Sequence, residues 1–209
     1  MPNKPTVVQT NSTPGSIKVV ELKVLTFQEL WDNYPTGDPY DNPAYKDQCA
    51  IRMSVTFHRV GIEMKSFSEK LIKPLSGQKS IGRIILDGKA TATRADELAE
   101  WLRQQPFAGL PKAEDITGTD WESKVKGRTG IIQFSRYWAR DGEGAANASG
   151  GHIDLWNRSR LTISSAPDAF ATIGRRLGYS SFRQGATMLP DISWSDLGGS
   201  KSILFWEIK

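Results

Sequence analysis

The sequence predicts an α+β fold in which N-terminal helices pack on a mostly antiparallel sheet. Helical periodicity with clear end signals marks the first half of the chain, whereas short apolar or alternating runs mark strands in the second half. Helices followed by a run of strands are typical of this fold class. With 209 residues, 38% of them hydrophobic, the chain suits a flexible N-terminal arm over residues 1–16 and a single domain over residues 17–209.

The first predicted elements follow directly after the arm. Residues 17–25, IKVVELKVL, suit a strand or an extended approach to the domain. The next residues, TFQELWDNYP, predict a short helix, because Thr26 can cap it and Glu29 stands three residues further on, as in a capping box. Pro35 is expected to end this helix.

Two longer helices are predicted next. A stretch of turn residues leads into CAIRMSVTFHRVG, whose helical periodicity begins at Cys49 and stops at Gly61, a residue type common at helix ends. The second helix is predicted over residues 93–106. Thr93 is its expected N-cap, with Asp96 at the third position after it and a proline at its end.

The second half of the chain is dominated by predicted strands. Residues 128–138 contain the short apolar run of a buried strand, and residues 151–157, GHIDLWN, alternate between apolar and polar side chains. A tight turn leads to a further strand over residues 159–164, and residues 202–209, SILFWEIK, form the last one. Between these, residues 167–178 predict a helix.

Composition excludes several classes of protein. A single cysteine rules out an internal disulfide framework, and no Cys and His residues have zinc-ligand spacing, so neither a metal nor a cofactor is expected. The net charge of +4 comes from scattered basic residues, without the aromatic and arginine platform of a nucleic-acid binder. The chain lacks a signal peptide and an apolar run of ~20 residues, so we expect a soluble protein, made in the cytoplasm, that does not insert into membranes.

The only cysteine, Cys49, allows two interpretations. It shares an apolar helix face with Met53 and Phe57, and free cysteine is often buried, so it can be a small packing residue. It also stands on the first turn of its helix, where the positive end of the helix dipole and unpaired backbone N–H groups favour a thiolate. The same N–H groups can stabilise an oxyanion, which makes Cys49 a candidate nucleophile.

A thiol nucleophile needs a base, and the chain has two histidines. His58 lies on the predicted helix of Cys49, about 180° around its axis and about 13 Å along it, so it is excluded as the partner and expected on the solvated surface. His152 follows two glycines that allow another segment to approach, and alternation places it on one strand face with Asp154 and Trp156. Such a histidine can be structural, but it is also the base that a Cys–His pair requires.

These segments resemble a known family. CAIRMS at the head of a helix, KGRTGIIQF, GHIDLWN and the closing SDLGGSKSILFWEIK together resemble the type VI secretion amidase effectors of family 4. Members of this family are papain-like peptidoglycan amidases, which bacteria inject into the periplasm of neighbouring cells. The resemblance runs from about residue 25 to the C-terminus and implies a papain-like fold for this chain.

The resemblance also implies an activity and its partners. Cys49 corresponds to the family's nucleophile and His152 to its general base, for hydrolysis of the amide between γ-D-glutamate and meso-diaminopimelate in the peptidoglycan stem. The family's members are exported by the type VI secretion machinery and are neutralised by a dedicated immunity protein that plugs the active-site groove. We therefore expect a secreted antibacterial toxin that acts in the periplasm of target cells.

The residue that orients the imidazole is the one point at which the sequence departs from the family. Some members carry an aspartate eleven residues after the histidine, but here that position is Ile163, which cannot accept a hydrogen bond. Asp154 is a possible orienting residue because it shares the strand face of His152, although ~7 Å along a strand is far for a direct bond. The alternatives are Ser164 or Thr162 through a local shift, a backbone carbonyl, or water.

Two other functions remain open on this scaffold. One is a housekeeping wall hydrolase or acyltransferase, although such enzymes usually carry a signal peptide or a wall-binding module. The other is a non-catalytic binding protein in which Cys49 is merely buried.

Overall fold

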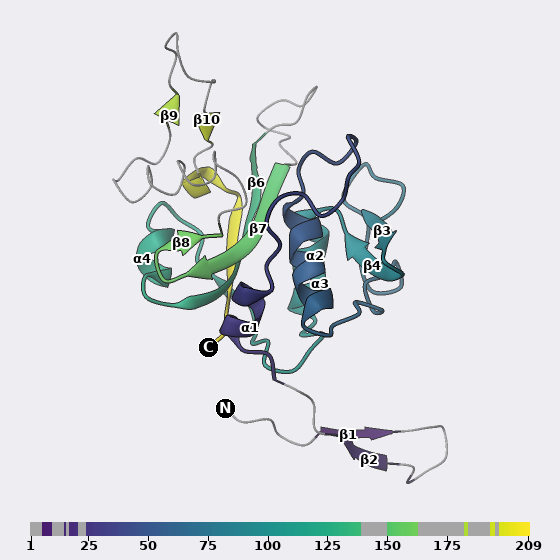
Figure 1. Ribbon diagram of the computed structural model, residues 1–209. Helices are drawn as coiled ribbons and strands as arrows, with labels where there is room; N and C mark the ends of the chain where they lie inside the picture. The colour runs from purple at the N-terminus through teal and green to yellow at the C-terminus, as the bar shows by residue number, and fades with distance from the viewer. Residues whose placement is uncertain are drawn as a thin grey trace.

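The computed structural model shows an α+β architecture built around a five-stranded antiparallel sheet, which confirms the predicted fold class (Figure 1). Its strands lie in the order β5-β11-β6-β7-β8. They are β5 (Glu114–Asp115), β6 (Thr129–Trp138), β7 (Gly150–Asn157), β8 (Arg160–Leu161) and β11 (Ser202–Glu207). The structure describes residues 6–9, 15, 17–20, 24–138, 150–162, 182–183, 193–194 and 197–209.

The strands predicted on either side of the sheet's centre are confirmed as β6 and β7. These two strands pair from Thr129 opposite Asn157 to Phe134 opposite His152, and the register then shifts before Trp138. The last predicted strand is confirmed as β11 and lies between β5 and β6. The strand predicted over residues 159–164 appears as the two-residue β8, while Ile163 and Ser164, like the helix predicted at 167–178, lie outside the described residues.

A hydrophobic cluster packs against each face of this sheet. Side chains alternate along β6, so Ile131 joins the cluster under the main helices, whereas Ile132 and Phe134 join the cluster on the opposite face. The first face is covered by α2 (Cys49–Arg59) and α3 (Ala95–Arg103), and the second by α4 (Trp121–Val125), as Figure 1 shows. The sheet is therefore shared between two cores.

Helix α1 (Phe27–Asp32) forms for the local reason that the sequence indicated. The Thr26 hydroxyl accepts a hydrogen bond from the Glu29 amide at 3.3 Å, and the Glu29 carboxylate accepts one from the Thr26 amide at 3.0 Å, so the predicted capping box is confirmed. The Phe27 amide donates to the Lys209 carbonyl oxygen at 3.0 Å, which fixes α1 beside the residues that follow β11.

Helix α2 begins at Cys49 and ends at Arg59, close to the predicted bounds. Gly61 follows with a φ of 93°, a left-handed conformation that glycine adopts without strain. The Gly61 amide bonds the His58 carbonyl at 3.1 Å and the Ile62 amide bonds the Phe57 carbonyl at 2.8 Å, which is the Schellman arrangement of helix ends. The predicted apolar stripe is also present, with Met53 and Phe57 fully buried.

The predicted start of α3 was wrong. The helix begins at Ala95, its N-cap is Arg94 rather than Thr93, and no side chain caps it. The Asp96 carboxylate does not serve the helix end because β6 satisfies it: Gln133 donates at 2.6 Å and Ser135 at 2.9 Å. Asp96 therefore ties α3 to the sheet.

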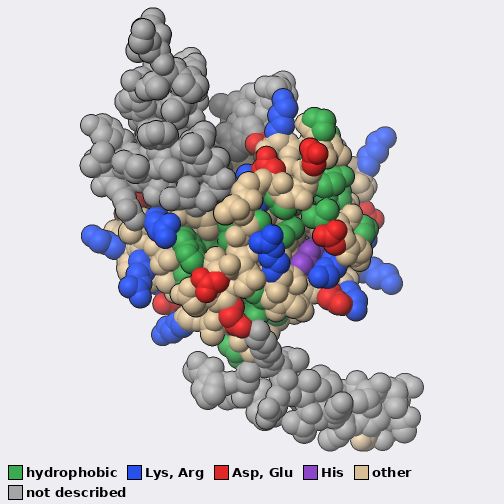
Figure 2. Space-filling model, viewed as in Figure 1, with side chains coloured by type: hydrophobic (Ala, Val, Ile, Leu, Met, Phe, Trp, Pro, Cys, Tyr) green, Lys and Arg blue, Asp and Glu red, His purple; other side chains and the backbone are tan. Residues whose placement is uncertain are grey.

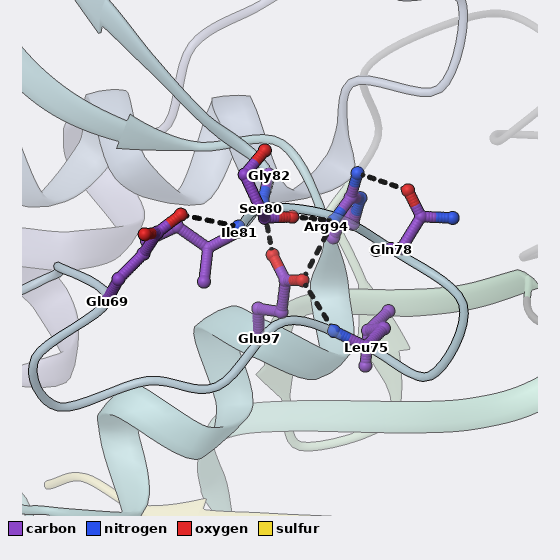
Figure 3. Close-up of polar contacts among 8 residues, drawn as sticks. All are labelled: Glu69, Leu75, Gln78, Ser80, Ile81, Gly82, Arg94 and Glu97. Carbon is purple, nitrogen blue, oxygen red and sulfur yellow. Dashed lines mark hydrogen bonds and ion pairs between the residues drawn. The ribbon is translucent and has the colours of Figure 1, made fainter.

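The next residue of α3, Glu97, fastens a loop onto the helix (Figure 3). Its side chain is fully buried, and its carboxylate accepts hydrogen bonds from the Leu75 amide at 3.1 Å, the Gly82 amide at 2.5 Å and the Arg94 guanidinium at 2.9 Å. Arg94 also donates to the Ser80 carbonyl at 2.9 Å. The buried carboxylate thus has a cationic partner and two backbone donors, which offset its desolvation.

The other strands that the structure describes form antiparallel pairs. Strand β3 (Arg83–Leu86) pairs with β4 (Lys89–Ala92), and β4 packs on α2, where the Ser54 hydroxyl accepts from the Ala92 amide at 3.0 Å. Strand β1 (Thr6–Gln9) pairs with β2 (Ile17–Val20), so the N-terminal segment expected to be an arm contains a paired strand. The last pair is β9 (Phe182–Arg183) with β10 (Ser193–Trp194), and a short 3-10 turn, Leu197–Gly199, precedes β11.

Charged side chains are mixed on the surface. Figure 2 shows acidic and basic groups of the described residues interspersed over the face that is drawn. The net charge of +4 is therefore not gathered into one patch on that face. Within the described ranges, no helix has the length and hydropathy needed to cross a bilayer.

Candidate active site

Cys49 stands at the start of α2, half-buried beside the helix-side core. The first backbone bond of the helix runs from the Arg52 amide to the Gln48 carbonyl at 2.8 Å, so the amides of Cys49, Ala50 and Ile51 have no partner within the helix. The buried Gln48 side chain bonds both the amide and the carbonyl of Tyr40, at 3.1 and 2.7 Å. This clamp fixes the turn-rich loop against the helix start.

Strand β7 brings His152 to the same place. The Cys49 Sγ atom lies 4.0 Å from the carbonyl oxygen of Gly151, the residue before His152, and the His152 side chain interacts electrostatically with the thiol. Gly151 permits close packing of β7 on β6 and α3, because a Cβ atom there would stand 3.0 Å from both the Phe134 carbonyl oxygen and an Asp96 carboxylate oxygen. The close approach expected at the glycines before His152 is therefore confirmed for Gly151.

The environment of this pair favours a thiolate and an imidazolium. Burial alone would raise the pKa of the Cys49 thiol, but the hydrogen bond and charge of His152, with the Ile153 and Ala50 amides, outweigh it and lower the pKa. Burial alone would lower the pKa of His152, but Asp154 and Cys49 outweigh it and raise the pKa to about 10. Both shifts favour the thiolate and imidazolium forms of the pair over the neutral forms.

The expectation that Asp154 lies too far from His152 for direct contact was wrong. His152 Nε2 stands 3.4 Å from Asp154 Oδ2, and Asp154 is 3% exposed. Alternate residues of a strand are ~7 Å apart at the backbone, but side chains on one face lean along the strand, and these two lean toward each other. Since Nε2 faces the carboxylate, Nδ1 is the ring nitrogen left for Cys49.

The second oxygen of Asp154 is held from behind. Asp154 Oδ1 accepts a hydrogen bond from the Leu155 amide at 2.7 Å and a short one from the Thr162 hydroxyl. Thr162 thus bonds the Asp154 carboxylate. As the alternative orienting residue, reached through a local shift, it would have had to face the imidazole instead. Ser164, the other alternative, lies outside the described residues.

Sequence reasoning missed Tyr34 as a residue of this site. Its half-buried side chain interacts with the Thr162 side chain and with the charges of Asp154, Arg52 and Cys49. Burial first, and then the negative charge of Asp154, raise the pKa of the Tyr34 phenol well above its usual value. In the sequence, Tyr34 is marked only by its position just after the capped helix α1. That position does not indicate which residues Tyr34 contacts.

The other candidates have structural surroundings. His58 lies away from the pair and its Nε2 bonds the Ala90 carbonyl at 3.0 Å, so it is half-buried rather than solvated as expected. Trp156 packs in the core opposite the main helices, and its indole donates to the Val125 carbonyl at 2.9 Å. Arg52 pairs with Asp38 at 2.7 Å. In the described part of the chain, Cys, His, Asp and Glu form no group of three suited to a metal ion.

The described residues form an α+β fold in which a helix that starts at a cysteine packs on an antiparallel sheet, an arrangement that suits a cysteine amidase. The chain belongs to the family of the type VI secretion system amidase effector protein 4, Tae4, whose family model matches residues 45–206. The matched range includes Cys49 and His152.

Solved structures of the same family resemble this chain at low identity. One is the type VI effector Tae4 from Enterobacter cloacae, with 16% identity and a TM-score of 0.48, covering 91% of this chain and 100% of that one. Another is the Tae4–Tai4 effector–immunity complex from Salmonella Typhimurium, with 17% identity and a TM-score of 0.45, covering 88% of this chain and 98% of that one. Among curated proteins, none matches this chain.

Proposed function

We propose that this effector is a peptidoglycan amidase that cleaves the bond between γ-D-glutamate and meso-diaminopimelate by Cys–His nucleophilic catalysis. The observation that carries the proposal is the position of Cys49 at a helix start, with its sulfur 4.0 Å from the Gly151 carbonyl oxygen and therefore next to His152 on β7. Membership of an amidase effector family supplies the reaction class. Asp154 is proposed as the residue that orients the imidazole, because its carboxylate faces Nε2.

The first half of the reaction forms an acyl-enzyme. The Cys49 thiolate attacks the carbonyl carbon, a C–S bond forms, and the carbonyl electron pair moves onto oxygen. The amides at the start of α2 are proposed to donate to that oxyanion. When the carbonyl re-forms, the C–N bond breaks and His152 gives its proton to the departing amine of diaminopimelate. A thioester and a neutral imidazole remain.

The second half restores the enzyme. Neutral His152 accepts a proton from a water molecule as the water oxygen attacks the thioester carbon. The C–S bond breaks, the Cys49 thiolate leaves, and the imidazolium is present again. The net reaction consumes one water and yields a peptide ending in a free D-glutamate γ-carboxyl group and one beginning with diaminopimelate.

The family and the chemistry together suggest where the enzyme acts and what restrains it. The substrate is a component of the periplasmic wall, so the proposed route is type VI export from the producer into the periplasm of a target cell. Relatives from Enterobacter cloacae and Salmonella Typhimurium are known in complex with the immunity protein Tai4. We propose that this chain likewise has a cognate immunity protein, which covers the Cys49–His152 pair.

The test is direct digestion of the wall. Purified sacculi or muropeptides containing diaminopimelate are incubated with the wild-type protein, Cys49→Ala and His152→Ala, and the products are separated by chromatography and identified by mass spectrometry. We expect D-glutamate-terminated and diaminopimelate-headed fragments with the wild type alone. His58→Ala is the matched control, because it removes the other histidine of the chain and should leave digestion intact. Absence of these fragments with folded wild-type protein would contradict the proposal.

A non-catalytic binding protein fits the site less well. Such a protein would have no need to lower the pKa of its cysteine, and an apolar environment would raise it instead. A housekeeping wall hydrolase shares the proposed chemistry, but membership of an effector family favours the secreted toxin.

A further inference from the structure

Two hydroxyl groups lie in series behind the carboxylate of Asp154. The Thr162 hydroxyl donates a short hydrogen bond to Asp154 Oδ1, while Asp154 Oδ2 faces His152 Nε2 at 3.4 Å. Thr162 is 7% exposed and Asp154 is 3% exposed, so water competes little for these bonds. The two oxygens of one carboxylate are thus divided between the imidazole and a fixed support.

Tyr34 lies at the outer end of this arrangement, where its phenol interacts with the Thr162 side chain. A threonine hydroxyl has one hydrogen, and Thr162 gives it to Asp154. A hydrogen bond between the two hydroxyls therefore needs the Tyr34 O–H as its donor and the Thr162 oxygen as its acceptor.

The backbone around Tyr34 is well anchored. Pro35, the next residue, is buried, and the turn after it is tied to α2 because Arg52 Nε donates to the Gly37 carbonyl at 3.0 Å and Arg52 Nη2 pairs with Asp38 at 2.7 Å. Burial and the charge of Asp154 raise the pKa of the phenol, so Tyr34 keeps its proton and remains a donor over the range in which the enzyme would work.

We propose that Tyr34 and Thr162 are positioning residues that hold the Asp154 carboxylate in the rotamer that faces the His152 imidazole. Without the Thr162 donor, the Leu155 amide would still hold one oxygen of Asp154, but the carboxylate could rotate and lose its alignment with Nε2. This role rests on the proposed function, because the group being positioned is the one that orients the general base.

The test compares Thr162→Val, Thr162→Ser and Tyr34→Phe with the wild type. We expect Thr162→Val to lower kcat on muropeptides by ~10-fold or more with little change in KM, since the lost bond orients the base and does not touch substrate. Tyr34→Phe should show a smaller loss. Thr162→Ser should recover most of the activity, because it restores the hydroxyl. The double variant should lose no more than Thr162→Val, since the two bonds act in series.

A second readout does not depend on the substrate. The rate at which iodoacetamide alkylates Cys49 is measured against pH, because this rate follows the thiolate that His152 stabilises. In Thr162→Val the rise in rate should move to higher pH by about half a unit or more, and Thr162→Ser should reverse the shift. Tyr45→Phe, which removes a hydroxyl from a ring that contacts Tyr40, is the matched control and should leave the profile unchanged.

The outcomes separate the two proposals. A wild-type pH profile and kcat in folded Thr162→Val, or failure of Thr162→Ser to restore them, would overturn the positioning role. Thermal denaturation establishes that each variant is folded. If the alkylation profile shifts as expected but the wild type cleaves no muropeptide, the positioning role stands and the proposed substrate is wrong.

Discussion

At the scale of single residues, the chemistry of Cys49 depends on a partner supplied by another element. Burial by itself would keep the thiol protonated, whereas the imidazole of His152 and two backbone amides favour the charged form. The helix start adds the positive end of the α2 dipole. The neighbours of the thiol therefore favour its thiolate form, and removal of the imidazole should raise the pKa of Cys49 again.

The first prediction follows from this balance. In His152→Ala, burial should dominate and raise the pKa of the Cys49 thiol, so alkylation by iodoacetamide at pH 7 should slow by ~10-fold or more. His58→Ala should alkylate like the wild type, because His58 bonds β4 instead. Equal rates in the wild type and His152→Ala would show that the two side chains are not paired in solution.

A second prediction concerns Asp154 and the pH dependence of hydrolysis. Loss of its charge in Asp154→Asn should lower the pKa of His152 from about 10, since the carboxylate is among the groups that raise it. The imidazolium then loses its proton at lower pH, so the alkaline limb of the kcat/KM profile should move down. NMR titration measures this directly, with His58 as an internal reference in the same spectrum. An unchanged His152 titration would contradict the assigned role.

At the scale of elements, α3 is held by two adjacent carboxylates that bond in different directions. Asp96 bonds β6, and Glu97 bonds the loop that contains Leu75 and Gly82. Neither follows the helical capping rule that the sequence suggested. Tertiary contacts therefore position α3. The stability lost when one of its carboxylates is mutated should depend on how deeply that carboxylate is buried.

The third prediction compares two glutamates of this helix. Glu97→Gln leaves the Arg94 guanidinium without its charge partner and replaces an acceptor with a donor, so the free energy of unfolding should fall by ~3 kcal/mol. Glu100→Gln should change it by less than ~1 kcal/mol, because Glu100 is 61% exposed and pairs with Arg103 at the surface. Urea denaturation measures both. Similar costs for the two variants would mean that the Glu97 network adds little.

What the sequence could predict depends on how local each feature is. The capping box of α1 and the glycine end of α2 involve residues within a few positions, and both were predicted correctly. The hydrogen bonds to Asp96 come from Gln133 and Ser135 on β6, which are 37 and 39 positions away in the sequence. No local sequence pattern predicts them. The sequence likewise indicated Cys49 and His152 as a candidate pair, but it did not indicate the hydrogen bond that Thr162 donates to Asp154.

At the scale of the whole molecule, the sheet joins two hydrophobic clusters. Consecutive residues of β6 serve different clusters, with Ile131 under α2 and α3 and Ile132 on the α4 side. Both side chains are fully buried. Neither core can loosen without disturbing the strand that the other shares, so the described domain should unfold as one unit.

The fourth prediction tests whether the described domain unfolds as one unit. Ile131→Ala and Ile132→Ala should each lower the free energy of unfolding by ~2–5 kcal/mol, and each should retain a single transition. In both variants, the alkylation rate of Cys49 should change from its folded to its unfolded value at the same midpoint as tryptophan fluorescence. Ile85→Ala is the control, because Ile85 is 58% exposed and should cost under ~0.5 kcal/mol. Two separate midpoints in either core variant would contradict a shared sheet.

The contact between Cys49 and Gly151 spans 102 positions of sequence. Closing so long a loop costs about 4 kcal/mol of chain entropy, and only the completed fold supplies the contacts that offset it. In an unfolded chain the Cys49 sulfur has no base beside it and behaves as an ordinary thiol with a pKa of ~8.5. We therefore expect the raised reactivity of the Cys49 thiol to appear only when the chain folds and to be lost again when it unfolds.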